Sequence, residues 1–127
     1  MKISKNRVNG FILKSIFISL LFIISYLAFS RCEVSIVKHL WDKFNHFIAF
    51  FTLFILFAFS FANLTTIKRF ALLLLYAVFI EFVQYFLPYR ECSFLDIIAD
   101  FIGMVGGYVV LKYVLILDFI KIKKVFI

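Results

Sequence analysis

Residues 45–62 read NHFIAFFTLFILFAFSFA, a run that is apolar at almost every position. A run of this length can cross the hydrocarbon core of a bilayer as an α-helix. It does not alternate between apolar and polar residues, as a strand of a membrane β-barrel does. Because a segment in lipid must satisfy its own backbone hydrogen bonds, the run predicts a transmembrane helix.

Three further apolar runs cover about residues 11–29, 70–87 and 95–117. The chain has 127 residues, of which 65% are hydrophobic, and its mean hydropathy is +1.10. A water-soluble domain of this size has too small an interior for so much apolar surface. We therefore predict an all-α fold, a four-helix transmembrane bundle that forms a single domain over residues 1–127.

Lysine and arginine are distributed unevenly between the two ends of such a bundle. Nine lie at one end: Lys2, Lys5, Arg7, Lys14, Lys68, Arg69, Lys121, Lys123 and Lys124. Four lie at the other: Arg31, Lys38, Lys43 and Arg90. Cytoplasmic loops carry the excess of positive charge, so both termini are predicted to be cytoplasmic and the first and third loops to face outside. Topology thus accounts for the net charge of +7, and nucleic acid is not an expected partner.

Two cysteines, Cys32 and Cys92, fall on the predicted outer side, where disulfides can persist. Two free thiols are the favoured interpretation, because the sequence does not give their separation. A disulfide that ties the first helix to the third loop is the alternative.

Charged and polar residues occur where the second run begins, at Asp42, Lys43 and His46. A charge at bilayer depth costs at least about 2.5 kcal/mol, so these groups require partners or a use. Asp42 and His46 are four residues apart and share a helix face. Asp42 or Asn45 is also suited to cap the helix N-terminus. For His46, a structural hydrogen-bonding role and a ligand or proton-transfer role are both open.

The third run ends with Glu81, Gln84, Pro88 and Arg90. Glu81 and Gln84 share a face, and Glu81 lies about 9 Å below the outer end of the helix. Pro88 ends the helix. Arg90 is suited to hold a phosphate or carboxylate in a bidentate fork, or to pair with Glu81 or Asp96.

The fourth run begins with Asp96 and Asp100, which share one helix face with Gly103 and Gly107. Ser93 followed by Asp96 resembles a helix N-terminal cap. Ala99, Gly103 and Gly107 form a ridge of small residues that allows a neighbouring helix to approach closely, so we assign them to helix packing. Asp100 lies at about the depth of Glu81, and the bundle can bring the two acids together.

Taken together, these residues resemble the VanZ-like family of small bacterial membrane proteins, over about residues 40–107. The resemblance rests on the following residues: Asp42, Lys43, His46, Phe47, Ala49, Phe50, Glu81, Gln84, Phe86, Pro88, Arg90, Asp96, Ala99, Asp100, Gly103 and Gly107. The family is named for a member of a glycopeptide-resistance gene cluster. The resemblance therefore implies antibiotic resistance as one possible role of this protein. In that family the position of Asp100 is often Asn, and the extra acid offers a pairing with His46 or Arg90.

The resemblance and the polar residues lead to one main hypothesis and two alternatives. The main hypothesis is a multi-pass protein of the bacterial plasma membrane and cell envelope. It binds an amphiphilic lipid, lipid-linked glycan or lipoglycopeptide in a polar pocket between the second, third and fourth helices, on the extracytoplasmic side. The expected ligand-binding residues are Asp42, Lys43, His46, Glu81, Gln84, Arg90, Asp96 and Asp100.

The first alternative is a membrane-embedded enzyme that modifies such a lipid. Its candidate acid–base residues are Glu81, Asp96 and Asp100, with His46 as a proton shuttle. No cofactor is indicated and no metal site is expected from the spacing, although these acids and His46 are residue types that can bind a divalent metal. The second alternative is an accessory scaffold subunit of another membrane protein.

Overall fold

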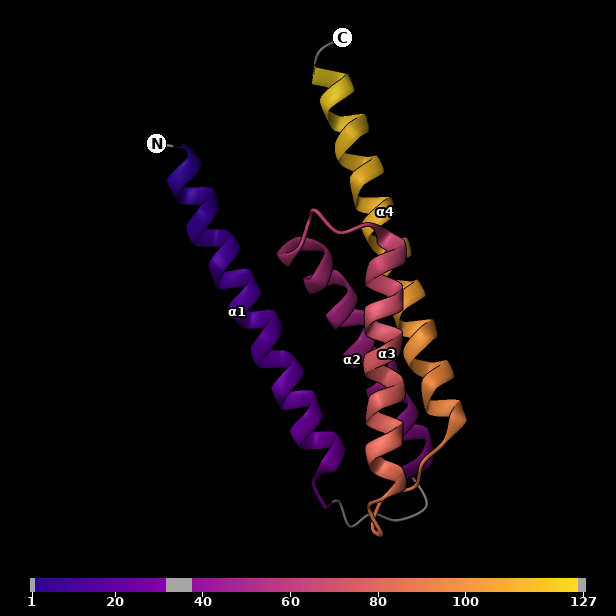
Figure 1. The fold of residues 1–127 in the computed structure, drawn as a ribbon. Helices are drawn as coiled ribbons and strands as arrows, with labels where there is room; N and C mark the ends of the chain where they lie inside the picture. The colour runs from indigo at the N-terminus through magenta and orange to yellow at the C-terminus, as the bar shows by residue number, and fades with distance from the viewer. Residues whose placement is uncertain (1, 32–37, 126–127) are drawn as a thin grey trace.

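The structure is a computed structural model that describes residues 2–31 and 38–125, with side chains described over 10–31 and 41–118. The chain forms four α-helices: α1 (Lys2–Phe29), α2 (Lys38–Ser60), α3 (Thr66–Tyr85) and α4 (Phe94–Val125). No strand occurs among the described residues, which confirms the all-α prediction. The helices run alternately up and down, so that both ends of the chain lie at the same end of the bundle (Figure 1).

Three of the helices contain segments long and apolar enough to cross a membrane: Gly10–Phe29, Trp41–Ser60 and Phe94–Asp118. The remaining helix, α3, has 20 residues and a length of about 30 Å, but it includes Lys68, Arg69 and Glu81. The structure thus confirms a helical protein with three segments that are long and apolar enough to span a membrane. The crossing by α3 remains a prediction.

The helices extend beyond the apolar runs that predicted them. α2 begins at Lys38, so Asp42 and Asn45 lie inside the helix, and the expectation that either caps its N-terminus is wrong. The apolar run marks where the hydrocarbon begins, whereas a helix can continue into the interface, where water and headgroups solvate polar side chains. α4 likewise continues to Val125, past the apolar run predicted to end at about residue 117.

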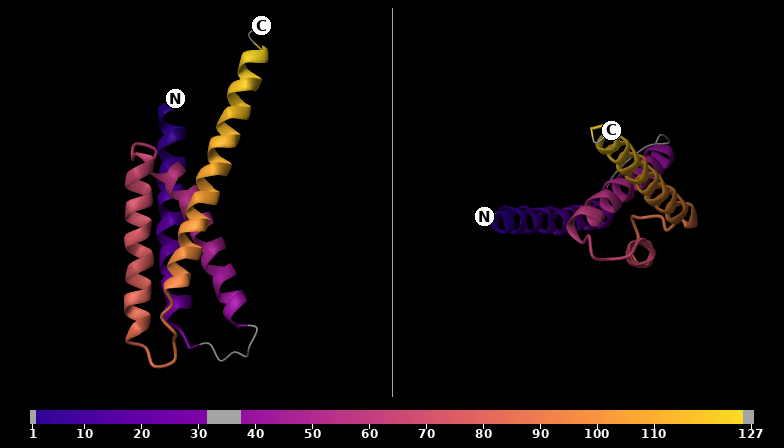
Figure 2. Two further views of the ribbon diagram at one scale, coloured as in Figure 1. Left: turned by 90° about the vertical axis from the view of Figure 1, so that its right-hand side faces the viewer. Right: turned by 90° about the horizontal axis from the view of Figure 1, so that it is seen from above.

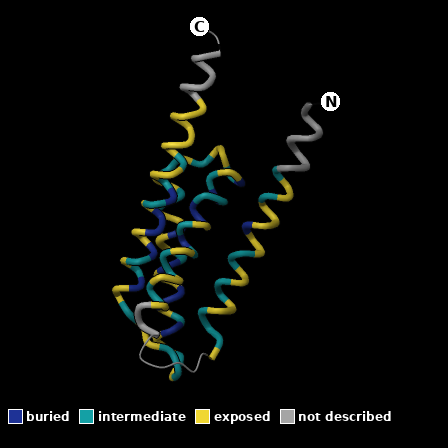
Figure 3. Tube along the Cα trace, turned by 180° about the vertical axis from the view of Figure 1, so that it is seen from behind, coloured by how far each residue is buried: buried dark blue, intermediate teal, exposed yellow. Residues whose placement is uncertain are grey.

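The core lies where α2 meets α3 and α4, and it is built largely from aromatic and aliphatic side chains. The most deeply buried of these are Phe50, Leu53, Phe54, Leu73, Ala77, Ile80 and Met104. Figure 3 shows that buried positions face the interior, while exposed positions line the outside. Large outward side chains such as Phe11, Phe22 and Tyr26 are about three-quarters exposed, as expected of a surface in contact with lipid.

The closest approach between helices is that of α4 to α2. A Cβ atom added at Gly103 would lie 2.4 Å from the Phe47 carbonyl oxygen, and one at Gly107 would lie 3.0 Å from the Phe51 carbonyl oxygen. These two positions admit only glycine without a shift of one helix. The small-residue ridge of α4 therefore lies directly against the backbone of α2, and the two helices cross in Figure 2.

The first helix, α1, is peripheral and leans away from the others toward its N-terminus (Figure 2). The Phe17 ring stacks on the Phe57 ring of α2, with centroids 4.9 Å apart. The Ser60 hydroxyl donates to the Leu13 carbonyl over 3.0 Å, and the Tyr76 hydroxyl donates to the Leu21 carbonyl over 2.9 Å. α1 thus diverges from the other helices at the end of the bundle that holds the termini and lies nearer to them at the loop end (Figure 1).

Candidate functional site

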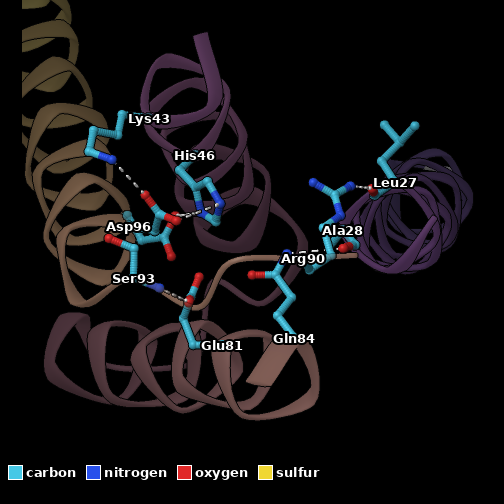
Figure 4. Close-up of polar contacts among 10 residues, drawn as sticks. Leu27, Ala28, Lys43, His46, Glu81, Gln84, Arg90, Ser93 and Asp96 are labelled. Carbon is cyan, nitrogen blue, oxygen red and sulfur yellow. Dashed lines mark hydrogen bonds and ion pairs between the residues drawn. The ribbon is translucent and has the colours of Figure 1, made fainter. Parts of the chain in front are cut away.

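The polar residues predicted from the sequence gather at the loop end of the bundle, opposite the chain termini. α2 and α4 begin at this end and α3 finishes there, so the up-and-down topology collects Lys43, His46, Glu81 and Asp96 from three helices (Figure 4). Among these, Glu81 and Asp96 are buried, and only 11% of the His46 side chain is exposed. The close contact of α4 with α2 sets the separations within this cluster.

His46 is held between the two acids of α4. Its Nδ1 atom lies 2.8 Å from Asp100 Oδ1, which is a hydrogen bond, and its Nε2 atom lies 3.9 Å from Asp96 Oδ2. If Asp100 is ionised its carboxylate can only accept, and Nδ1 is then the donor of this hydrogen bond. Lys43 Nζ lies 3.4 Å from the other oxygen of Asp96. Asp100 therefore fixes the orientation of the imidazole, and Asp96 receives Lys43.

Glu81 contacts the beginning of α4. Its Oε2 atom accepts a hydrogen bond of 2.9 Å from the backbone N–H of Ser93, the residue before the first turn of α4. In a capping box the acid three residues into the helix would accept this N–H. Here Glu81 of a different helix does so, and Asp96 is left to contact Lys43 and His46. A carboxylate near a helix N-terminus is also favoured by the helix dipole.

Negative charge exceeds positive charge in this cluster. Asp42, Glu81, Asp96 and Asp100 contribute four carboxyl groups, whereas Lys43 is the one lysine or arginine that pairs with them among the described residues. Two buried oxygens, Glu81 Oε1 and Asp100 Oδ2, have no hydrogen-bond partner. Buried polar atoms are nearly always paired, so these two atoms indicate that water, a proton or a ligand completes the cluster.

One interpretation of the sequence paired Arg90 with Glu81 or Asp96. In the structure Arg90 instead donates hydrogen bonds to backbone carbonyls. Four consecutive carbonyl oxygens at the end of α1, those of residues 27–30, accept side-chain hydrogen bonds. The donors are Gln84 Nε2 at 2.9 Å, the Tyr89 hydroxyl at 2.8 Å, and Arg90, whose guanidinium reaches two of the carbonyls. The last carbonyls of a helix have no intrahelical partner, so these side chains satisfy the C-terminus of α1.

A cavity of ≈ 350 Å³ lies between α1, α2, α3 and the loop after α3. Its polar lining comprises Ser30, Trp41, Asp42, Asn45, His46, Gln84 and Arg90. Its apolar lining comprises Ile24, Leu27, Ala28, Ala49, Phe50 and Ile80. The pocket had been expected between the second, third and fourth helices, but α1 forms its wall in place of α4. Glycines bring α4 directly against α2, and the cavity lies instead beside the last turns of α1.

Comparison with protein families identifies the chain. The family model described as VanZ/LLP1 matches residues 4–117, which includes all four apolar runs and every residue of the polar cluster. The chain belongs to the VanZ/LLP1 family. Comparisons with curated proteins and with solved structures found no match. Membership of the VanZ/LLP1 family confirms the resemblance drawn from the sequence.

Of the predicted site residues of this VanZ/LLP1 protein, the structure brings one group together around His46 and another around the end of α1. Asp42, Asp96 and Asp100 belong to the first group. One possible metal-ligand atom each from Asp42, His46 and Asp96 lies within 4.8 Å of the others. Gln84 and Arg90 belong to the second group. Glu81 lies beside the first group, with Asp96 and His46 as charged neighbours.

Tyr89 is the contributor that the sequence analysis missed. Its hydroxyl donates to the Phe29 carbonyl, and its ring lies under the Arg31 guanidinium at 5.3 Å from the ring centroid. The sequence feature that could have indicated this role is the position of the tyrosine directly after Pro88, where the chain leaves the third helix. A buried hydroxyl there requires a hydrogen-bond partner, and a neighbouring helix end offers free carbonyls.

Cys92, in the loop between α3 and α4, is a free and exposed thiol. Its pKa is raised above the usual value, first by partial burial, next by its contact with Glu81, and then by the charge of Asp96. Cys32 lies outside the described residues, but the free thiol of Cys92 agrees with the favoured interpretation and not with the disulfide. The raised pKa favours the thiol over the reactive thiolate at neutral pH.

Proposed function

We propose that this VanZ/LLP1 protein binds the headgroup of an amphiphilic envelope lipid in the cavity between α1, α2 and α3. In this proposal all four helices cross the bacterial plasma membrane, and the loop end of the bundle faces the outer leaflet. The observation that carries the proposal is the distribution of groups along the cavity. Ser30, Asn45 and Arg90 lie near the loop end, whereas Ile24, Phe50 and Ile80 lie deeper along their helices.

That distribution matches an amphiphile. Of the five guanidinium N–H groups of Arg90, those on Nε and Nη2 donate to α1 carbonyls, which leaves donors for an anionic or hydroxyl-rich headgroup. The buried Oε1 atom of Gln84 has no partner and is available as an acceptor. The apolar residues below offer a surface for the first carbons of an acyl or polyprenyl chain.

The size of the cavity sets a limit on what it can enclose. A volume of ≈ 350 Å³ is at the lower end of the range for small-molecule pockets. It is sufficient for a phosphate with a glycerol unit or a single sugar, but not for a whole lipoglycopeptide. A larger ligand would therefore insert one part and leave the rest outside, which favours a lipid or lipid-linked glycan held by its headgroup.

Native mass spectrometry of the purified protein tests this proposal. Ala49 lines the cavity, so Ala49→Phe fills it, while Ala71→Phe adds the same volume to an exposed position of α3 and serves as the matched control. Wild type and Ala71→Phe should retain one lipid class selectively, and Ala49→Phe should lose it while keeping its helical content. Retention of the same lipid by Ala49→Phe, or no selective lipid on folded wild type, would refute the cavity as the binding site.

A second candidate function is acid–base modification of the bound lipid. The observation that favours it is the hydrogen bond between His46 and Asp100, because a carboxylate that orients an imidazole is the usual support of a general base. His46 also lines the cavity. Incubation of the retained lipid with wild type and His46→Gln, followed by mass analysis of the lipid, distinguishes an enzyme from a binding protein: only an enzyme changes the mass.

A further inference from the structure

We propose that Asp42, His46 and Asp96 form a binding site for one divalent transition-metal ion, Zn²⁺ or Mn²⁺. The site lies between the first turns of α2 and the first turn of α4, behind one wall of the cavity. Its three donors come from a face of α2, where Asp42 and His46 are one turn apart, and from α4. The inference rests on the geometry of these side chains and does not require the lipid proposal.

The imidazole of His46 is already oriented as a metal ligand. Its Nδ1 atom is engaged by Asp100 Oδ1 at 2.8 Å, so Nε2 is the ring nitrogen that remains for a metal, and it lies 3.9 Å from Asp96 Oδ2. Histidines that ligate metals commonly donate their other N–H to a carboxylate, which fixes the ring and raises the basicity of the ligating nitrogen. Asp100 thus has the position of a supporting residue and not of a ligand.

Asp96 presents one oxygen to the same space. Its Oδ1 atom contacts Lys43 Nζ at 3.4 Å, and its Oδ2 atom lies 3.9 Å from His46 Nε2. That separation is too long for a hydrogen bond. It suits two donors that share one ion, since bonds of about 2.0–2.2 Å place such donors between about 3 and 4.4 Å apart. Asp42 supplies the third donor, and all three donor atoms lie within 4.8 Å of one another.

The buried atoms around this space provide an independent indication of a cation. Glu81 is only 3% exposed, and its Oε1 atom has no hydrogen-bond partner. Figure 4 shows the Glu81 carboxylate projecting from α3 toward Asp96 and His46. Asp100, which is fully buried, also has one unpaired oxygen. A divalent ion would balance the excess of carboxylates that Lys43 alone leaves.

The donor set selects the class of metal. One imidazole nitrogen and two carboxylate oxygens suit Zn²⁺ or Mn²⁺, whereas Mg²⁺ and Ca²⁺ prefer sites made only of oxygen. Three protein donors leave at least one coordination position open. Asp42 and His46 also line the cavity, so the open position would face it. If the proposed lipid binding holds, an anionic group of the headgroup can occupy that position.

The proposal is tested directly by the metal content and Zn²⁺ binding of the purified protein, which is produced without a histidine tag. Titration calorimetry with Zn²⁺ alone, in a detergent without lipid, should give one site per chain. His46→Ala and Asp96→Asn should weaken binding at least tenfold. Asp118→Asn removes a carboxyl group from the exposed far part of α4 and should leave binding unchanged. No binding by folded wild type, or equal binding by His46→Ala and Asp96→Asn, would overturn the assignment.

The supporting role of Asp100 has its own readout. Asp100→Asn retains an acceptor for His46 Nδ1 but removes the charge, so Zn²⁺ affinity should fall about 10–100-fold without loss of the bound stoichiometry. The melting temperature of the metal-free variant shows whether it is folded. Ala49→Phe separates this proposal from lipid binding, because filling the cavity should abolish selective lipid retention while Zn²⁺ binding to the chain persists.

Discussion

The separation of α2 from α4 can be perturbed at a single atom. In Gly103→Ala the added Cβ would meet the Phe47 carbonyl oxygen at 2.4 Å, against an ordinary contact of at least 3.4 Å, so the two backbones must part by 1.0 Å at this point. Because the obstacle is backbone, no side-chain rotation relieves it. Overpacking of this kind costs about 1–3 kcal/mol. The better helix propensity of alanine offsets up to about 1 kcal/mol of that, so we expect a net loss of about 1 kcal/mol.

Gly106→Ala is the matched control for this variant. Its added Cβ would meet the Phe51 ring at 3.3 Å and the Phe47 ring at 3.8 Å, and a ring can shift by a few tenths of an ångström. We expect a change in unfolding free energy between zero and a gain of about 1 kcal/mol. Equilibrium unfolding in mixed micelles, followed by circular dichroism, measures both variants. Equal stability of Gly103→Ala and Gly106→Ala would refute the close approach of α4 to α2.

The same perturbation should reach the polar cluster. Phe47 directly follows His46, and Gly103 lies one turn after Asp100, so a 1.0 Å separation would stretch the 2.8 Å contact between His46 and Asp100 beyond hydrogen-bonding distance. Gly103→Ala should therefore weaken Zn²⁺ binding more than Gly106→Ala does. Unchanged affinity in a destabilised Gly103→Ala would show that the cluster does not depend on this helix contact.

Three further predictions follow from individual contacts. Tyr89→Phe removes the donor to the Phe29 carbonyl and should lower the unfolding free energy by about 0.6 kcal/mol, measured as above, whereas Tyr113→Phe on the exposed face of α4 should have no effect. Glu81→Ala removes the acceptor for the Ser93 N–H and should cost about 1 kcal/mol, with Glu81→Gln recovering most of it; equal losses in the two variants would contradict the capping role. In a Cys32→Ser background, a membrane-impermeant maleimide should label Cys92 in intact cells. Because the pKa of this thiol is raised, the labelling rate at pH 7 should be lower than that of a cysteine with an ordinary pKa. The rate should increase about tenfold per pH unit. No labelling until the cells are permeabilised would contradict an outward-facing loop.

The sequence was sufficient for the helices and for the composition of the polar cluster. Apolar runs predict spans because lipid offers no hydrogen bonds, and spacing by four placed Asp42 with His46 and Asp96 with Asp100 on shared faces. The glycines of α4 indicated a close helix contact, but not that α2 was the partner. That choice depends on the packing of the whole bundle.

Other features could not be read from residue types. Arg90 was expected to pair with a carboxylate, yet its partners in the structure are backbone carbonyls of α1, which have no signature in a sequence. The cavity depends on where the last turns of α1 lie against α2 and α3, and that placement is set by contacts along the helices. Arg90 was one expected partner of Glu81. In the structure the partner of Glu81 is the N-terminus of α4, and this could only be seen once α3 and α4 were placed side by side.

The most direct test of lipid binding is an experimental structure of the protein crystallised from a lipid mesophase together with its co-purified lipids. Our account predicts elongated density in the cavity between α1, α2 and α3, with its polar end near Arg90 and Asn45 and its apolar end near Ile24 and Ile80. The Ala49→Phe variant should lack that density. A cavity that holds only water, or that closes by the approach of α1 to α2, would contradict the account.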